Sequence, residues 1–402
     1  MIVPSPTPSG APGRHSRTAR NAHIRALQTH TLAVVTVLVI STPPPAAGHQ
    51  QWWTDAPIAE TRTIGVTIGE PEYEFSSISA IRFLPDNRIV VADAGLHNIR
   101  VFTTDGVHVR TMGRSGGGPG EYVTPTSIFV DTLIRVLDPR QGRVTIYSVE
   151  TLELRTTRPL QSLGGYLATR VGILSDGSLI ASTIPPVSYH GREEPLPLAL
   201  VLRLRPGGSV DTLMRYQMGG ALWYTVGRSA PYGGARTPFG PGGAWAIDGP
   251  VLALADGIAA EVRYLRLQPD GTLRQEARVT LPGEGSRPVV AEDMQEVEDS
   301  LRALLARARR SPGRIGLIGP THWSTAWAAR FGTDGTLWIF RATRTARGQV
   351  WTQLSRDRIL GSWRFPPGFS LHDVRYPWAA GVKTDEEGVQ VVQLLRLADD
   401  RP

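Results

Sequence analysis

A unit of four short strands repeats along most of the chain, and it constrains the fold more than any other feature. Residues 78–112 run in the order strand, turn, strand, loop, strand, turn, strand, and residues 127–157 repeat that order. Asp-Gly dipeptides between apolar runs favour tight hairpins. They recur at 105–106, 176–177, 270–271 and 334–335. The pattern predicts consecutive four-stranded antiparallel units of roughly 45 residues.

Four antiparallel strands in about 45 residues make one blade of a β-propeller. The first turns of successive units lie near Asp86, Asp131, Asp176, Asp248, Asp334 and Tyr376. These turns define six blades, two intervals carry insertions, and the last blade has only three strands. We expect TRTIGVTI, residues 61–68, to supply its outer strand, because pairing both ends of the chain removes the edges of an open ring. The predicted fold class is all-β, a six-bladed β-propeller closed by an N-terminal strand, with one inserted helix.

That helix is expected at residues 289–310. Val290, Met294, Val297 and Leu301 recur at three- and four-residue spacing. Acidic residues precede a group of arginines along the segment, which suits the helix dipole. The helix lies between the fourth and fifth blades, where it either packs on the ring to cover apolar surface or forms a lid or docking element.

The glycine-rich stretch GRSGGGPGEY, residues 113–122, raises the question of a phosphate-binding loop. Its spacing is not G-x-G-x-x-G, and no Gly-Lys-Ser/Thr follows. The next residues form an extended run rather than a helix whose N-terminus would hold an anion. We interpret the stretch as a connector between the first two blades, where glycine and proline permit a sharp turn.

Residues 1–48 are typical of an export signal. Arginines precede the apolar stretch Leu32–Ile40, and Ala46 and Gly48 suit cleavage after Gly48. The apolar stretch is shorter than the roughly 20 residues that span a membrane. An uncleaved anchor and a misplaced start codon are the alternatives. We expect a periplasmic or secreted protein with no transmembrane span beyond the signal. The expected divisions after it are a linker at 49–60, the propeller at 61–397 and a tail at 398–402.

The sequence contains 43 Lys and Arg and 36 Asp and Glu, which gives a formal charge of +7. Part of this excess comes from the leader, which contains Arg14, Arg17, Arg20 and Arg25. No basic run is interleaved with aromatic residues as a nucleic-acid groove requires, so we expect no nucleic-acid partner. The chain has no cysteine, which excludes disulfides, thiolate metal sites and cysteine nucleophiles.

Residues 99–122, IRVFTTDGVHVRTMGRSGGGPGEY, resemble the signature of a bacterial family of six-bladed β-propellers related to NHL repeats. Residues 334–366 and 379–397 fit the same family, so the resemblance covers about 61–397. The family is largely uncharacterised, and related propellers include binding scaffolds, lactonases and lyases. The resemblance therefore implies a fold and leaves the function open.

In a propeller, the loops between second and third strands share one face with the connectors between blades; we call it the connector face. Asp93, Asp138 and Asp256 each end a second strand there. Such acids bind a divalent cation such as Ca²⁺ or accept hydrogen bonds from the amides of their own turns, and their repetition favours the second interpretation. The candidate ligand contacts on this face are Asp93, His97, Arg114, Glu121, Tyr122, Asp138, Arg140, Asp256, His322 and Arg341.

These observations favour an exported scaffold that binds a ligand or a protein, rather than an enzyme. The expected partner is a protein or a small-molecule or glycan ligand, the expected state is a monomer, and no cofactor is expected. The alternative is a metal-assisted hydrolase resembling lactonases or esterases, with Ca²⁺ in the channel. No serine stands near an arguable His/Asp arrangement, and the histidines lack local metal spacing, so nothing in the sequence supports it.

Overall fold

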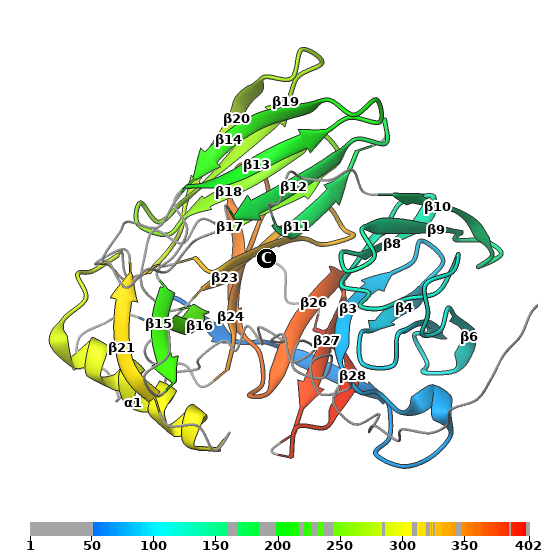
Figure 1. Ribbon diagram of the computed structural model, residues 1–402, viewed down its shortest axis with the longest axis horizontal. Coiled ribbons are helices and arrows are strands. Elements are labelled where there is room, and N and C mark those ends of the chain that lie inside the picture. The colour runs from blue at the N-terminus through cyan, green and yellow to red at the C-terminus, as the bar shows by residue number, and fades with distance from the viewer. Residues whose placement is uncertain are drawn as a thin grey trace, which may run out of the picture. The chain divides into compact units, whose positions relative to one another are not determined.

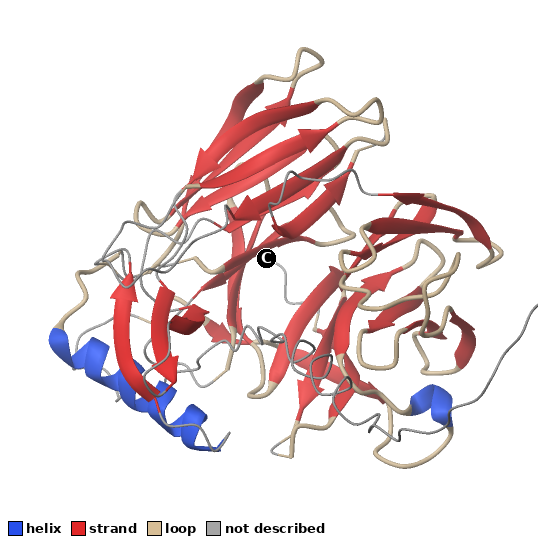
Figure 2. Cartoon of the chain, in the orientation of Figure 1, coloured by secondary structure: helices blue, strands red, loops and turns tan. Residues whose placement is uncertain are grey.

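The fold is known from a computed structural model (Figure 1). The structure describes residues 51–159, 167–174, 176–184, 198–216, 221–226, 231–236, 244–283, 286–307, 312–318, 322, 324, 326–341, 348–385 and 387–398. These residues form seven β-sheets, one α-helix and one 3₁₀ turn, so strands dominate (Figure 2). Six of the sheets are antiparallel units that follow one another along the chain, and we number them as blades 1 to 6.

Blades 1 to 3 each run from an inner to an outer strand, and each strand pairs antiparallel with the next. Blade 1 consists of β3 (Ile78–Phe83), β4 (Arg88–Asp93), β5 (Asn98–Thr103) and β6 (His108–Met112). Blade 2 consists of β7 (Ser127–Val130), β8 (Leu133–Asp138), β9 (Arg143–Ser148) and β10 (Leu154–Pro159). Blade 3 consists of β11 (Leu167–Ile173), β12 (Leu179–Ile184), β13 (Ala199–Leu204) and β14 (Val210–Tyr216).

Blades 4 to 6 repeat the same order of pairing. Blade 4 consists of β17 (Ala244–Asp248), β18 (Val251–Asp256), β19 (Glu261–Leu267) and β20 (Leu273–Thr280). Blade 5 contains β22 (Ala328–Phe331), β23 (Leu337–Arg341), β24 (Val350–Leu354) and β25 (Ile359–Arg364). Blade 6 takes β26 (Phe369–Arg375), β27 (Trp378–Thr384) and β28 (Gln390–Leu397) from the C-terminal part of the chain.

The N-terminal strand β2 (Ile58–Ile64) completes blade 6 by pairing antiparallel with β28, from Ile58 opposite Leu397 to Ile64 opposite Val392. This confirms the predicted closure, although the strand lies at 58–64 rather than 61–68. Gly65, with φ of +127°, ends it, because that backbone conformation is rarely adopted by other residues and breaks the extended run.

A second N-terminal strand, β1 (Thr54–Asp55), pairs parallel with β25 and adds a fifth strand to blade 5. It lies within the predicted linker, where the sequence analysis expected no strand. Asp55 holds the position through an ion pair with Arg364, whose guanidinium also stacks on Trp53 at 4.7 Å.

The long interval between blades 4 and 5 contains the predicted helix, α1 (Ala291–Arg307). Beside it lies a three-stranded sheet of β16 (Pro231–Arg236), β15 (Ala221–Val226) and β21 (Pro312–Ile318), which sequence analysis did not predict (Figure 1). A 3₁₀ turn, η1 (Pro71–Tyr73), precedes blade 1. No helix of the described residues is long and apolar enough to cross a membrane.

The hydrophobic core is divided among the seams between neighbouring blades. Val90 and Val136 belong to one cluster shared by blades 1 and 2, and five further clusters join the remaining pairs of neighbours, including blade 6 with blade 1. Each blade buries its two faces against two neighbours, so no blade has a core of its own. The inner strands of the ring are held around a central space by this packing.

Candidate functional site

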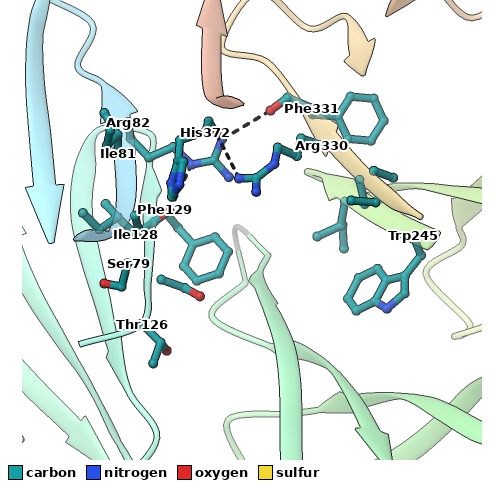
Figure 3. Close-up of a pocket in the computed structure, with 16 residues that line it drawn as sticks. Ser79, Ile81, Arg82, Thr126, Ile128, Phe129, Trp245, Arg330, Phe331 and His372 are labelled. Carbon is teal, nitrogen blue, oxygen red and sulfur yellow. Dashed lines mark hydrogen bonds between the residues drawn. The ribbon is translucent and has the colours of Figure 1, made fainter. Parts of the chain in front are cut away.

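A cavity of about 270 Å³ lies among the inner strands and is the candidate site (Figure 3). Its described lining comes from β3, β17, β22 and β26, and from β7 with the residue before it. The lining residues are Ser79, Ala80, Ile81, Arg82, Thr126, Ser127, Ile128, Phe129, Trp245, Ala246, Ile247, Ala328, Ala329, Arg330, Phe331 and His372.

Arg82 lies near the end of β3 and lines the cavity. Its Nε donates to the carbonyl of Ile128 at 3.2 Å, and its Nη1 donates to the carbonyl of Phe331 at 3.4 Å. Nη1 also contacts Oδ1 of Asp373 at 3.1 Å. The guanidinium therefore joins blade 1 to blades 2, 5 and 6 while 27% of the side chain stays exposed.

Arg330 holds a similar position near the end of β22. Its Nη1 donates to the carbonyl of His372 at 3.1 Å, and its guanidinium carbon lies 5.8 Å from the centroid of the Trp351 ring. Figure 3 shows the side chains of Arg330, Arg82 and His372 gathered on one side of the cavity, with Phe129 near them.

His372 reaches the cavity because of an irregularity in β26. The register with β27 shifts between Leu371 and Asp373, so His372 is the extra residue of a β-bulge, and bulges re-aim side chains. Burial and the positive charges of Arg330 and Arg82 hold the pKa of His372 well below its usual value. The imidazole is therefore neutral at pH 7.

Asp373 follows His372 but lies behind the cavity wall, where it is 2% exposed. Its carboxylate accepts hydrogen bonds from the backbone N–H groups of Phe83 and Val374 and from the hydroxyl of Thr333. Burial raises the pKa of Asp373, whereas Arg82 and these donors lower it, and the net direction is upward. The two neighbours thus face different surroundings, and Asp373 fixes Arg82 rather than acting on a ligand.

Asp93 and Asp138, both predicted on the connector face, are fully buried turn-capping residues. The carboxylate of Asp93 accepts four backbone N–H bonds, from residues 76, 77, 95 and 96. The carboxylate of Asp138 accepts three, from residues 123, 124 and 141. Each carboxylate thus links the loop after the second strand of a blade to the connector that enters the same blade. Of the two interpretations drawn from the sequence, the structure shows the turn-capping one.

Asp256 caps its own turn in a simpler way. Its Oδ1 accepts the backbone N–H groups of Ile258 and Ala259, each at 2.9 Å. Among the described residues, no group of three or more His, Asp or Glu side chains is placed to hold a metal ion. The carboxylates of Asp93 and Asp138 therefore do not fit the calcium interpretation, since both oxygens of each are taken by backbone amides.

Three further candidates belong to the glycine-rich connector. Glu121 accepts the backbone N–H of Gly118 at 2.7 Å and pairs with Arg114, and these contacts lower the pKa of Glu121. Tyr122 was expected on the connector face. It is instead fully buried in the seam between blades 1 and 2. Its hydroxyl lies 2.8 Å from that of Tyr147, so the apolar seam contains a satisfied polar pair.

The remaining candidates are dispersed. His97, in the left-handed region at φ 57°, has its Nδ1 2.8 Å from the carbonyl of Val123. Arg140 is exposed and His322 forms a backbone bridge with Pro288. Arg341 is 2% exposed, lies over the Trp52 ring at 4.6 Å, and has a pKa lowered to about 10 by burial.

None of the ten predicted contacts lines the central cavity, and sequence reasoning missed the three basic side chains that do. One signal was available. Arg82 and Arg330 each stand directly before a phenylalanine at the end of an inner strand, in AIRF and AARF. A charged residue inside an otherwise apolar strand, at equivalent places in two blades, indicates a surface that is not filled by packing.

A second cavity, of about 580 Å³, lies between blades 2 and 3. Its wall is mostly aliphatic, and two of its arginines are paired: Arg135 with Asp131 at 2.6 Å and Arg205 with Asp211 at 2.8 Å. Arg135 and Arg205 are thus already neutralised by acids, so we place the candidate site in the central cavity.

Comparison with known proteins supports the fold. Residues 70–164 match a family described as a 6-bladed beta-propeller. The chain is a six-bladed β-propeller. No curated protein is significantly similar to this propeller in sequence.

Solved structures with a similar fold include an inferred exported protein from Bacteroides fragilis. It is 12% identical to this chain, with a TM-score of 0.48. The alignment covers 86% of this chain and 99% of that one. A gluconolactonase from Xanthomonas campestris is 12% identical with a TM-score of 0.42 and coverage of 90% and 100%. A streptogramin B lyase is 10% identical with a TM-score of 0.41 and coverage of 84% and 98%. Such identities concern the fold alone.

Proposed function

We propose that the protein is an exported binding propeller that takes a small polar ligand into its central cavity. The observation that carries the proposal is the lining itself. Side chains from the inner strands of separate blades bring arginine, histidine, hydroxyl and aromatic groups together in one space. A concave site with a few polar groups among apolar ones is the usual form of a small-molecule site.

Binding is favoured over hydrolysis because the acids expected to hold a metal serve the loops instead. Asp93 and Asp138 use their carboxylate oxygens on backbone amides of the connector face. The guanidinium groups of Arg82 and Arg330 are donors held in place by protein contacts, and fixed donors suit recognition of a ligand. No contact in the described residues favours the hydrolase as a second candidate.

The test is to fill the cavity without disturbing the blades. Thr126→Trp places a large side chain at the cavity lining, and Thr124→Trp, two residues earlier and outside the lining, is the matched control. Both variants and the wild type are incubated with a defined library of sugars, amino acids, organic acids and phosphate esters, and bound compounds are detected by native mass spectrometry.

We expect at least one compound to bind the wild type and Thr124→Trp but not Thr126→Trp, because only the last blocks the space. A library in which every bound compound also binds Thr126→Trp would show that the ligand site lies elsewhere. Circular dichroism of each variant checks that the ring is folded.

The proposed export rests on residues 1–48, which lie outside the described residues. Expression of the full chain with fractionation, followed by N-terminal sequencing of the product, tests it. We expect a product outside the cytoplasm that begins at His49, since cleavage is predicted after Gly48. A cytoplasmic product with an intact leader would contradict the export part of the proposal and leave the binding part standing.

A further inference from the structure

The described part of the cavity wall contains two guanidinium groups and no carboxylate. Arg82 and Arg330 line the cavity, and no Asp or Glu occurs among the described residues that do so. The one acid in contact with Arg82 is Asp373, which lies behind the wall. The described lining thus presents two guanidinium groups to one space, and low-dielectric walls such as Phe129 strengthen their field within the cavity.

Donor atoms in this wall remain available to a ligand. The contacts of Arg82 use its Nε and Nη1, and within the described part of the chain its Nη2 has no protein partner. His372 is half-buried, and neither of its ring nitrogens bonds to another described residue. A neutral imidazole has one N–H donor, so arginine and histidine together offer N–H groups to the same space.

The guanidinium groups are already fixed. Arg82 is held by two carbonyl oxygens and the Asp373 carboxylate, and Arg330 by the carbonyl of His372 and the face of Trp351. Side chains ordered before binding lose little entropy when a ligand arrives. The planar arrangement of guanidinium N–H groups matches the oxygens of carboxylates and phosphates.

The volume limits the size of the ligand. A volume of about 270 Å³ is just below the range typical of pockets that bind drug-sized ligands. The cavity therefore suits a compound with few heavy atoms, or one terminal group of a larger compound, rather than a polymer.

Resting on the proposed binding function, we infer that the ligand is a small oxyanion whose carboxylate or phosphate group is held by Arg82, Arg330 and His372. The phosphate-loop interpretation of residues 113–122 plays no part in this, because that loop is a connector in which Glu121 binds the backbone N–H of Gly118. The anion site is built instead from inner strands of blades 1, 5 and 6.

The experiment compares charged and uncharged probes on the wild-type protein by isothermal titration calorimetry. The anionic probes are orthophosphate, succinate and glucose 1-phosphate, and the neutral matches are succinamide and glucose. We expect one-to-one binding of at least one anion, binding of its neutral match weaker by 10-fold or more, and affinity that decreases with added salt. Comparing the affinities for phosphate and succinate shows which oxyanion geometry the cavity prefers.

Two variants of Arg330 and one control variant locate the site. Arg330→Gln should weaken anion binding by about 10- to 100-fold, because a charge-assisted contact contributes about 1.5–3 kcal/mol. Arg330→Lys should keep part of the affinity, since it retains charge without the planar pair of donors. Arg375→Gln is the matched control: Arg375 also lies on an inner strand and donates to two backbone carbonyls, but outside the cavity. It should bind anions as the wild type does.

The outcomes separate the inference from the proposed function. If neutral probes bind as tightly as anions and Arg330→Gln leaves affinity unchanged, the cavity binds ligands but the anion inference is wrong. If Arg375→Gln weakens binding as much as Arg330→Gln does, the anions bind the basic surface and the inference is also wrong. If nothing in the wider library depends on Thr126, the proposed function itself fails. The wild-type series decides the charge question even if Arg330→Gln does not fold.

Discussion

The connector face and the cavity wall use charged residues in opposite ways. On the connector face, Asp93 and Asp138 occupy equivalent places in two blades, and each carboxylate is buried and satisfied by backbone amides. On the wall, Arg82 and Arg330 face a shared space in which no carboxylate is exposed among the described lining residues. A residue that recurs to satisfy the backbone indicates structure, whereas charge kept in a cavity at some energetic cost indicates a ligand.

The largest effect expected is that of Asp93→Ala, which removes the acceptor of four backbone N–H groups in a fully buried position. Each such group left without a partner costs about 1–3 kcal/mol where water does not replace it. We expect the free energy of unfolding in urea to decrease by about 3–5 kcal/mol.

Asp256→Ala is its graded control, because that carboxylate accepts only two N–H bonds and is half-buried. Its cost should be about 1 kcal/mol. Affinity for a cavity ligand should be unchanged in both variants. If Asp93→Ala had wild-type stability but did not bind the ligand, the connector face would be the binding region and our assignment of the two regions would be wrong.

A smaller effect is expected from Gly120→Val in the glycine-rich connector. Gly120 has φ of +75°, a conformation that β-branched residues rarely adopt, and the strain should cost about 1–3 kcal/mol. Gly117→Ala is the matched control, because Gly117 has ordinary φ and its added Cβ would meet no atom within 4 Å. Thermal unfolding of both variants measures the difference. Equal melting temperatures would show that the connector tolerates a change of conformation.

The smallest expected effect concerns His372 in the cavity wall. It is a dependence of the free energy of unfolding on pH. The pKa of His372 is lowered in the folded protein by burial and by Arg330 and Arg82, while its unfolded value is near 6.5. The unfolded state therefore binds more protons below that pH. The contribution of His372 to stability is complete above about pH 6.5 and decreases as the pH falls toward the folded pKa, by at most about 1.4 kcal/mol per pH unit.

His372→Gln lacks this titration, so the wild type should lose more stability than the variant between pH 7.5 and 5.5 in urea unfolding. Asp373, whose pKa is raised, acts in the opposite direction at lower pH and is present in both proteins, so it cancels in the difference. Parallel pH profiles of the two proteins would mean that His372 is not held neutral by the wall.

The sequence predicted the connector face better than the cavity wall. The reason is the separation along the chain between the residues that form each region. The connector residues whose amides bind Asp93 lie only 16 and 17 residues before it, so this capping pattern can be seen locally and recurs at Asp138. Arg82 and Arg330 come from blades 1 and 5, and His372 reaches them through a bulge that leaves no trace in composition. Only the closed ring brings these three together.

Closure also predicts an order of events. Ile64 pairs with Val392, and the seam between blades 6 and 1 needs residues from both parts of the chain. Since every blade depends on two neighbours for its core, the first blade that leaves the ribosome has one face without a partner until the last strand appears. Contacts between such distant residues form slowly. The topology thus leaves the ring open until β28 is made, and the pairing of β28 with β2 is the step that closes it.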